Sequence, residues 1–204
     1  MSSRDVILGR IRSALDGSAP AAPVVREYRR GAGTADLDLL VERLTDYKAV
    51  VHRGSDIAAF VATILADLDH RPRVVVPPGI DRAWLPETVE AVPDDGLDQA
   101  TIAAADGVLT AATVVVAETG TIVLDASPDQ GRRVISLLPD LHICVIRPDQ
   151  VVASVPEALA RLDPRRPLTW ISGPSATSDI ELNRVEGVHG PRRLHVIVTE
   201  APHD

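Results

Sequence analysis

The sequence predicts an α/β fold built on a mostly parallel sheet, and two observations support this prediction. Short apolar strands alternate with amphipathic helices, so that residues 49–52 predict a strand, residues 55–68 a helix capped by Ser55, and residues 74–76 a second strand. Aromatic residues make up only 2% of the chain, so Val, Leu, Ile and Ala must fill the core. That composition is typical of a parallel sheet covered by close-packed helices.

The remaining elements follow from the same patterns. Ser2 or Ser3 is expected to cap a short helix that Gly17 ends, and the Gly- and Pro-containing stretch 17–35 reads as a linker. We therefore divide the chain into an N-terminal helix and flexible linker (1–35) and one α/β domain (36–204). Within the domain, helices are expected at 36–45, 131–138 and 156–162, and strands at 114–117, 121–124, 142–146, 168–171 and 194–199. Residues 80–98 look irregular.

Composition also limits the function. The net charge of -8 argues against binding to nucleic acid. Cys144 is the single cysteine, so the chain cannot form an internal disulfide or hold an all-cysteine iron–sulfur cluster by itself. The N-terminus lacks the apolar core of a signal peptide, and no apolar run approaches the roughly 20 residues that span a bilayer. We expect a cytoplasmic protein without a membrane span.

The first candidate site is the segment 117–121, between two apolar strands. A tight hairpin would explain Gly120 and Thr121, because glycine adopts positive φ and threonine favours strands. It would not explain Glu118, since glutamate is depleted beside buried strands. We therefore keep both readings, a structural turn and a site formed by Glu118, Thr119, Gly120 and Thr121.

The second candidate site follows the predicted strand 168–171. Hydroxyl and carboxylate side chains are dense there, and ligands of open α/β sheets bind beyond the carboxyl ends of strands. A polar loop with a helix cap is the structural alternative. The segment lacks the Gly-Lys-Ser/Thr of a P-loop, and the chain lacks a GxGxxG dinucleotide fingerprint. The candidate binding residues are Ser172, Gly173, Ser175, Thr177, Ser178, Asp179 and Glu181.

Histidines are the next candidates. His189 lies in a turn with other polar groups and is either a proton carrier or an ordinary turn histidine. His142 lies on an apolar strand and is expected to be a hydrogen-bonded core residue. No HExxH or CxxC spacing occurs, so we predict no metal site. The central hypothesis is that segments 117–121 and 172–191 meet in space and form one anion-binding pocket.

Three blocks of sequence resemble the LUD-domain family of lactate-utilization proteins. The string AETGTIVL at 117–124 is similar to the family's AETGT signature, and residues 131–145 resemble its GRR, SLLP and HICV block. Residues 170–181 and 186–191, WISGPSATSDIE and EGVHGP, resemble its C-terminal signature. Together the matches cover about residues 110–198, in a specific order and spacing.

The resemblance implies a three-layer α/β/α sandwich of the NagB/RpiA/CoA-transferase type. It also implies a role in L-lactate oxidation to pyruvate, as a subunit of a complex with two cysteine-rich iron–sulfur proteins. The iron–sulfur clusters are expected in those partners, and no cofactor is expected on this chain alone. For a small carboxylate ligand, Arg132 or Arg133 and the 172–178 loop would bind the carboxylate group. Glu118 or His189 would act as the base that accepts the proton of the hydroxyl group.

Two other classes of function stay open. The fold type also allows a stand-alone enzyme that resembles CoA transferases or sugar-phosphate isomerases, although fold does not imply function. A regulatory module that binds a carboxylate is the other alternative. No electron acceptor is apparent in the chain, which leaves open whether it is an enzyme by itself or one subunit of an L-lactate dehydrogenase complex.

Overall fold

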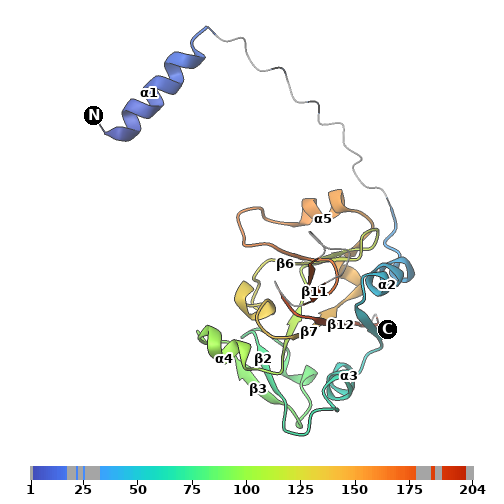
Figure 1. Cartoon of the computed structure of the whole chain (residues 1–204). Coiled ribbons are helices and arrows are strands. Elements are labelled where there is room, and N and C mark those ends of the chain that lie inside the picture. The colour runs from blue at the N-terminus through green and yellow to red at the C-terminus, as the bar shows by residue number, and fades with distance from the viewer. Residues whose placement is uncertain are drawn as a thin grey trace.

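The centre of the protein is a six-stranded sheet in which all neighbouring strands run parallel. The computed structural model describes residues 2–17, 22, 25, 33–177, 185–186 and 190–200. Figure 1 shows the sheet strands at the core of the domain, with helices around them. In spatial order the strands are β1 (Val50–Arg53), β12 (Arg193–Val198), β7 (Leu141–Ile146), β4 (Gly107–Ala111), β2 (Arg73–Val76) and β3 (Glu90–Pro93).

Helices cover both faces of this sheet, as the α/β prediction requires. On one face, α3 (Ile57–Ile64) packs Ile57 and Val61 against strand residues such as Ile143. On the other face lie α2 (Leu37–Asp46) and α4 (Gln99–Ala103). All residues of β4 and β7 are buried, which explains their nearly continuous apolar sequences.

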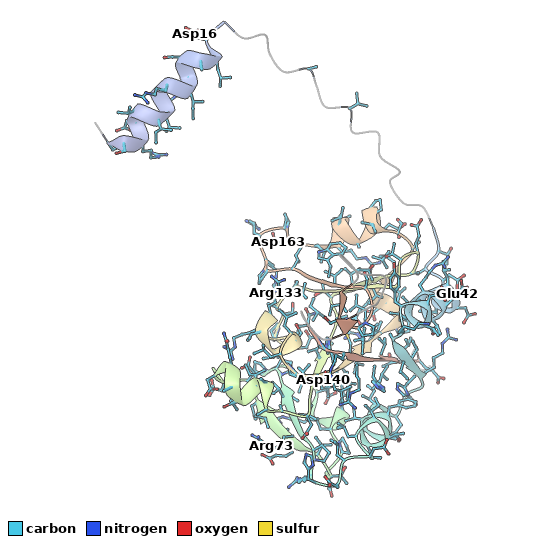
Figure 2. All side chains as sticks on the ribbon, in the orientation of Figure 1. Asp16, Glu42, Arg73, Arg133, Asp140 and Asp163 are labelled. Carbon is cyan, nitrogen blue, oxygen red and sulfur yellow. The ribbon has the colours of Figure 1, made fainter. Side chains whose placement is uncertain are left out.

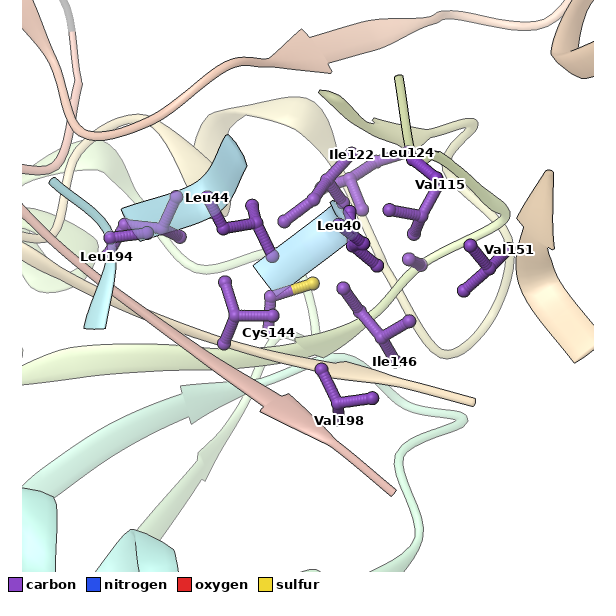
Figure 3. Close-up of a cluster of buried hydrophobic side chains, with 14 residues drawn as sticks. Leu40, Leu44, Val115, Ile122, Leu124, Cys144, Ile146, Val151, Leu194 and Val198 are labelled. Carbon is purple, nitrogen blue, oxygen red and sulfur yellow. The ribbon is translucent and has the colours of Figure 1, made fainter. Parts of the chain in front are cut away.

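A second, four-stranded sheet lies on the same side as α2. Its order is β8 (Val151–Val152), β5 (Val114–Val116), β6 (Thr121–Leu124) and β9 (Thr169–Ile171), and β5 and β6 form an antiparallel hairpin. Figure 3 shows Leu40 of α2 between Ile122 of this sheet and Cys144 of the large one. The outer face of the small sheet is covered by α5 (Val155–Arg161). The sequence did not predict this separate sheet.

The remaining described elements are short or peripheral. The N-terminal helix α1 (Ser3–Leu15) begins at a capping box of Ser2 and Asp5 and buries none of its residues. In the part of the chain that the structure describes, no helix is long and apolar enough to cross a membrane. Three 3-10 turns and a two-stranded ribbon complete the list: η1 (Arg82–Trp84), η2 (Arg133–Ser136), η3 (Pro148–Gln150), and β10 (Ala176–Thr177) paired with β11 (Val185–Glu186).

The elements depart from their predicted forms in a few places. The helix expected at 55–68 is capped by Asp56 and ends at Ile64, and the helix expected at 131–138 is only the 3-10 turn η2. The irregular stretch 80–98 contains β3, and the central strand β4 was missed. Gly107 and Ala111 flank only three larger residues in β4, so local propensity gives little sign of a strand whose formation depends on pairing with β2 and β7.

Candidate functional site

The loop after β9 forms one wall of a cavity of about 340 Å³, which we call the amino-edge pocket. Its size lies in the range of small-molecule sites. It is lined by β9 and the loop that follows it, by η2, and by the first residues of the central strands β7 and β12. The lining residues used below are Ser172, Gly173, Ser175, Arg133, His142 and Trp170.

The pocket lies at a different edge of the sheet from the one expected. His142 and Leu194, which line it, are the second residues of the parallel strands β7 and β12 and are paired in register. The pocket therefore opens at the amino ends of the parallel strands. The loop does follow the carboxyl end of β9, as expected, but β9 pairs antiparallel with β6 in the small sheet, and this end lies beside the amino ends of β7 and β12.

Two glycines let both candidate segments pack against the end of α2. Gly120 and Gly173 have φ values of +61° and +87°, a region that favours glycine. A Cβ atom at Gly120 would lie 2.8 Å from Arg43 Cβ, and one at Gly173 would lie 2.6 Å from the Tyr47 carbonyl oxygen. The end of α2 and the residue that follows it therefore serve as a common platform for the two turns.

Hydroxyl groups join the two segments directly. The Oγ1 atoms of Thr119 and Thr121 are 2.8 Å apart, and Thr121 Oγ1 lies 3.0 Å from Ser172 Oγ. Segments 117–121 and 172–175 thus meet in space, as the central hypothesis required. Only the segment 172–175 lines the cavity. The other segment, with Thr119, Gly120 and Thr121, contacts that wall through the bond between Thr121 and Ser172.

Arg133 is the one charged side chain among the described residues that line this pocket. Within the described part of the chain it has no ion pair, and Figure 2 shows it at the surface of the domain beside the other side chains. Arg132 instead donates hydrogen bonds to both carboxylate oxygens of Asp94 and to the Leu97 carbonyl oxygen. Of the two predicted arginines, only Arg133 lines the amino-edge pocket.

His142 forms the floor of the pocket as a neutral group. Its side chain is almost fully buried, and its Nε2 atom lies 2.8 Å from Thr110 Oγ1. Burial lowers the pKa of His142 to about 4. The prediction of a hydrogen-bonded core histidine is confirmed, and the positive charge of the pocket comes from Arg133 rather than from an imidazolium.

The other predicted residues lie apart from the cavity or outside the described residues. Glu118 is exposed in the turn between β5 and β6, and its amide donates to the Ala153 carbonyl oxygen. Thr177 is described only as part of the backbone of β10. Ser178, Asp179, Glu181 and His189 lie outside the described residues.

Sequence reasoning missed several residues that line the pocket. Ser136, at the end of η2, and Thr169 and Trp170, in β9, were read only as parts of elements. Trp170 is 41% exposed at the pocket, but its exposure depends on strand pairing and cannot be read from the local sequence. No three His, Cys, Asp or Glu side chains of the described residues are grouped so that they could hold a metal ion.

These features define an α/β protein with a small cavity that is lined by hydroxyl groups and by Arg133. Residues 83–199 match the LUD domain family, and the chain belongs to that family. It is 46% identical over 200 residues to the lactate utilization protein C of Deinococcus radiodurans, covering 94% of this chain and 93% of that one.

Two further relatives agree with this assignment. The lactate utilization protein C of Exiguobacterium sp. is 35% identical over 150 residues, covering 67% of this chain and 61% of that one. A crystal structure of a DUF162 family protein from Deinococcus radiodurans superposes with a TM-score of 0.68 at 41% identity, covering 80% of this chain and 96% of that one. The relationship therefore extends through most of the domain.

Proposed function

We propose that the protein is the subunit without clusters in a lactate-utilization system, in which a complex oxidises L-lactate to pyruvate. Membership of the LUD family and the names of its relatives support the pathway. The observation that carries the proposal is the amino-edge pocket, where Arg133 is the single described charge in a cavity of about 340 Å³ lined by hydroxyl groups. Such a pocket suits a small carboxylate.

Arg133 holds the carboxylate in this proposal. A guanidinium group presents parallel N–H donors that match the two oxygens of a carboxylate. Ser172 and Ser175 place hydroxyl groups on the wall of the same cavity. Because the His142 imidazole is neutral, Arg133 supplies the attraction for the anion and His142 supplies shape.

The electrons of lactate leave through the partner proteins in this scheme. Cys144 is the single thiol of the chain, it is buried, and burial raises its pKa to about 12. A thiol in that state is a poor ligand for an iron–sulfur cluster. Two cysteine-rich iron–sulfur proteins are therefore the expected partners, and this chain contributes a site or a docking surface to the complex.

The experiment is lactate-dependent dye reduction by the complex reconstituted from this chain and the two iron–sulfur partners. Arg133→Met should lower kcat/KM for lactate by about a hundredfold, mainly through KM, because it removes a charge-assisted bidentate contact. Arg165→Met is the matched control, since Arg165 is 89% exposed and pairs with Asp163 away from the pocket. Equal activity of the Arg133 and Arg165 variants would refute this role of the pocket.

The purified chain alone separates this proposal from a stand-alone enzyme. Turnover of an acyl-CoA or a sugar phosphate without partners would favour the enzyme of CoA-transferase or isomerase type. Glu118→Gln tests the candidate base in the complex. Because Glu118 is exposed at the hairpin turn, the variant is expected to fold, and a wild-type rate would remove Glu118 from the reaction.

A further inference from the structure

A second cavity lies at the opposite edge of the parallel sheet. From β2 the chain moves outward to β3 and then returns to the other side of β2 to form β4. This reversal of direction leaves a crevice at the carboxyl ends of β2 and β4, which is the place where open α/β sheets bind ligands. A cavity of about 460 Å³ occupies it, and we call it the carboxyl-edge pocket.

The carboxyl-edge pocket is built from the segments that leave the central strands. Gly79 follows β2, Ala112 and Thr113 follow β4, and Arg147 follows β7. The five residue steps from His142 in β7 to Arg147 just beyond it span roughly 16 Å, so this pocket is separate from the amino-edge pocket. Neither candidate segment of the sequence analysis contributes to it.

The loop 125–131 crosses the crevice and is fixed to both neighbouring strands. The amide of Ala111 donates to the Asp129 carbonyl oxygen at 3.0 Å, and the amide of Gly79 donates to the Pro128 carbonyl oxygen at 2.8 Å. A Cβ atom at Gly79 would lie 2.7 Å from Pro128, so the contact requires glycine. Ala126 has a φ of +59°, a strained conformation for alanine.

Side chains brace the same loop from inside the domain. The buried Gln130 accepts a hydrogen bond from the Asp125 amide at 2.7 Å and bonds the Thr113 hydroxyl at 2.8 Å. Arg166 pairs with Asp125 at 3.0 Å and donates to Ser127 Oγ at 3.2 Å. The loop is therefore held in one conformation before any ligand binds, which is the condition for a precise site.

The two charged side chains that line the pocket have opposite signs. Asp129 is partly buried, and this burial raises the pKa of its carboxyl group, an effect that the nearby Arg147 partly opposes. Arg147 is about half exposed and lies 3.4 Å from the exposed Asp149, a weak surface pair that leaves its guanidinium open to a ligand. The strained loop thus presents a carboxylate and a guanidinium to one cavity.

We propose that the carboxyl-edge pocket binds a small carboxylic acid whose neighbouring carbon bears a hydrogen-bond donor. Arg147 holds the ligand's carboxylate, and Asp129 accepts a hydrogen bond from the donor group. The donor is a hydroxyl in a 2-hydroxy acid or an ammonium group in a 2-amino acid. The described lining of the amino-edge pocket offers no carboxylate to accept such a bond. This site does not depend on the proposed function.

The test is titration of the full-length chain at pH 7, followed by amide NMR shifts of Thr113 and Gln130. The ligands are L-lactate, L-alanine and propionate, which have similar size and differ in the donor. We expect lactate or alanine to bind about tenfold or more tightly than propionate, because a hydrogen bond to a charged acceptor is lost in propionate. Which of the two binds identifies the donor.

Variants assign the two contacts. Asp129→Asn should reduce the preference over propionate at least about fivefold, and Arg147→Met should weaken all ligands about tenfold or more. Arg165→Met is the control for loss of a surface charge. Both pocket side chains are partly exposed, so the variants should keep the wild-type amide spectrum away from the pocket.

Three results would overturn the proposal: equal affinity for all three ligands, unchanged affinity in both variants, or no shift of Thr113 and Gln130 at saturating ligand. Signals of Ser136 and Ser172 report on the amino-edge pocket in the same spectra. A shift at those residues alone would preserve the proposed function while refuting the second site. Shifts at Thr113 and Gln130 alone would do the reverse.

Discussion

The two ends of β7 carry opposite kinds of pocket. At the amino end, the buried His142 is kept neutral, and Arg133 is the single described charge of the lining. At the carboxyl end, Asp129 and Arg147 face a more open cavity with opposite charges. The comparison teaches that the two ends of one strand can border cavities of different charge, one lined by a single described cation and the other by a cation and a carboxyl group.

The two pockets differ in charge because the titratable groups at the two ends of β7 are buried to different extents. Between the two sheets at the amino end, desolvation makes ionisation costly, so the histidine gives up its proton. At the carboxyl end, the loop 125–131 leaves Asp129 partly exposed, and its partial burial raises the pKa of the carboxyl group. Burial therefore shifts the pKa of both groups toward the neutral form, and it does so most strongly for the fully buried His142.

Gly173→Ala should lower the free energy of unfolding more than the substitutions below. It should disturb only the pocket at the amino end of β7. Alanine at φ +87° is strained, and its Cβ atom would lie 2.6 Å from the Tyr47 carbonyl oxygen. Strain and overpacking together should lower the free energy of unfolding by about 3–4 kcal/mol. Gly96→Ala is the control, because Gly96 has φ +74° with open space around it and should lose only about 1 kcal/mol.

Urea unfolding of both glycine variants gives the measurement. Equal destabilisation of the two would mean that the contact with Tyr47 adds nothing to the cost of positive φ. The Gly173 variant should also lose the Ser172 contact with Thr121, whereas Asp129 and Arg147 should be unaffected. Such a result would show that the two ends of β7 are independent.

The neutral state of His142 predicts an acid-sensitive domain. The folded pKa of about 4 lies below the unfolded value of 6.5, so the unfolded chain binds a proton that the folded chain does not. Stability from this group is complete above pH 6.5 and falls as the pH drops toward 4, by roughly 3 kcal/mol. The free energy of unfolding at several pH values measures the loss.

His142→Gln isolates this contribution, because glutamine does not titrate and can still bond the Thr110 hydroxyl. The variant should be less stable at pH 7 but should show a flatter pH dependence between 6.5 and 4. Burial also lowers the pKa of His195 to about 4, and that slope stays in both proteins. An unchanged slope in the variant would mean that His142 is protonated in the folded protein.

Substitutions of the adjacent Arg132 and Arg133 should differ sharply in their effect on the free energy of unfolding. The side chain of Asp94 is only 1% exposed, so Arg132→Met leaves a buried carboxylate without its guanidinium partner. We expect a loss of about 2 kcal/mol, reduced from the fully buried case because Arg132 is half exposed. Arg133→Met should cost less than about 0.5 kcal/mol. Thermal unfolding of both variants under one buffer tests the contrast.

The sequence predicted the class of the fold because most strands are apolar runs and most helices carry caps such as Asp36. It did not predict the second sheet. The β5 and β6 sequences are buried on both faces, like those of β7, so periodicity cannot assign them to a separate sheet. Only strand pairing, which is a long-range property, makes that assignment.

The site was predictable only in part for the same reason. Dense hydroxyl groups correctly drew attention to 172–175, and the link from Thr121 to Ser172 joins the two candidate segments. Nothing local distinguishes Arg132 from Arg133, because the buried partner Asp94 lies 38 residues away. The sequence did not single out Asp129 as a pocket residue. The crevice beside it forms where the chain changes direction between β2 and β4, and this depends on the positions of those strands in the sheet.

Asp129→Asn should have the smallest effect on stability and the most specific pH dependence. The folded pKa of Asp129 is raised, so its contribution to stability is complete below the unfolded value of 3.8 and is lost as the pH rises through the folded pKa. Asparagine avoids that loss and should stabilise the protein at neutral pH by a few tenths of a kcal/mol, with no gain at pH 3.

The groups around Asp129 sharpen this last prediction. Burial and the charge of Asp125 raise the pKa, whereas Arg147 and the hydrogen bond from Gln130 lower it. In an Arg147→Met background the opposing cation is gone, so the gain from Asp129→Asn at neutral pH should be larger. A double-mutant cycle measured by urea unfolding tests the coupling. A gain that Arg147→Met leaves unchanged would mean that the two charges do not share one cavity, and the carboxyl end of β7 would then lack the paired charges that set it apart from the amino end.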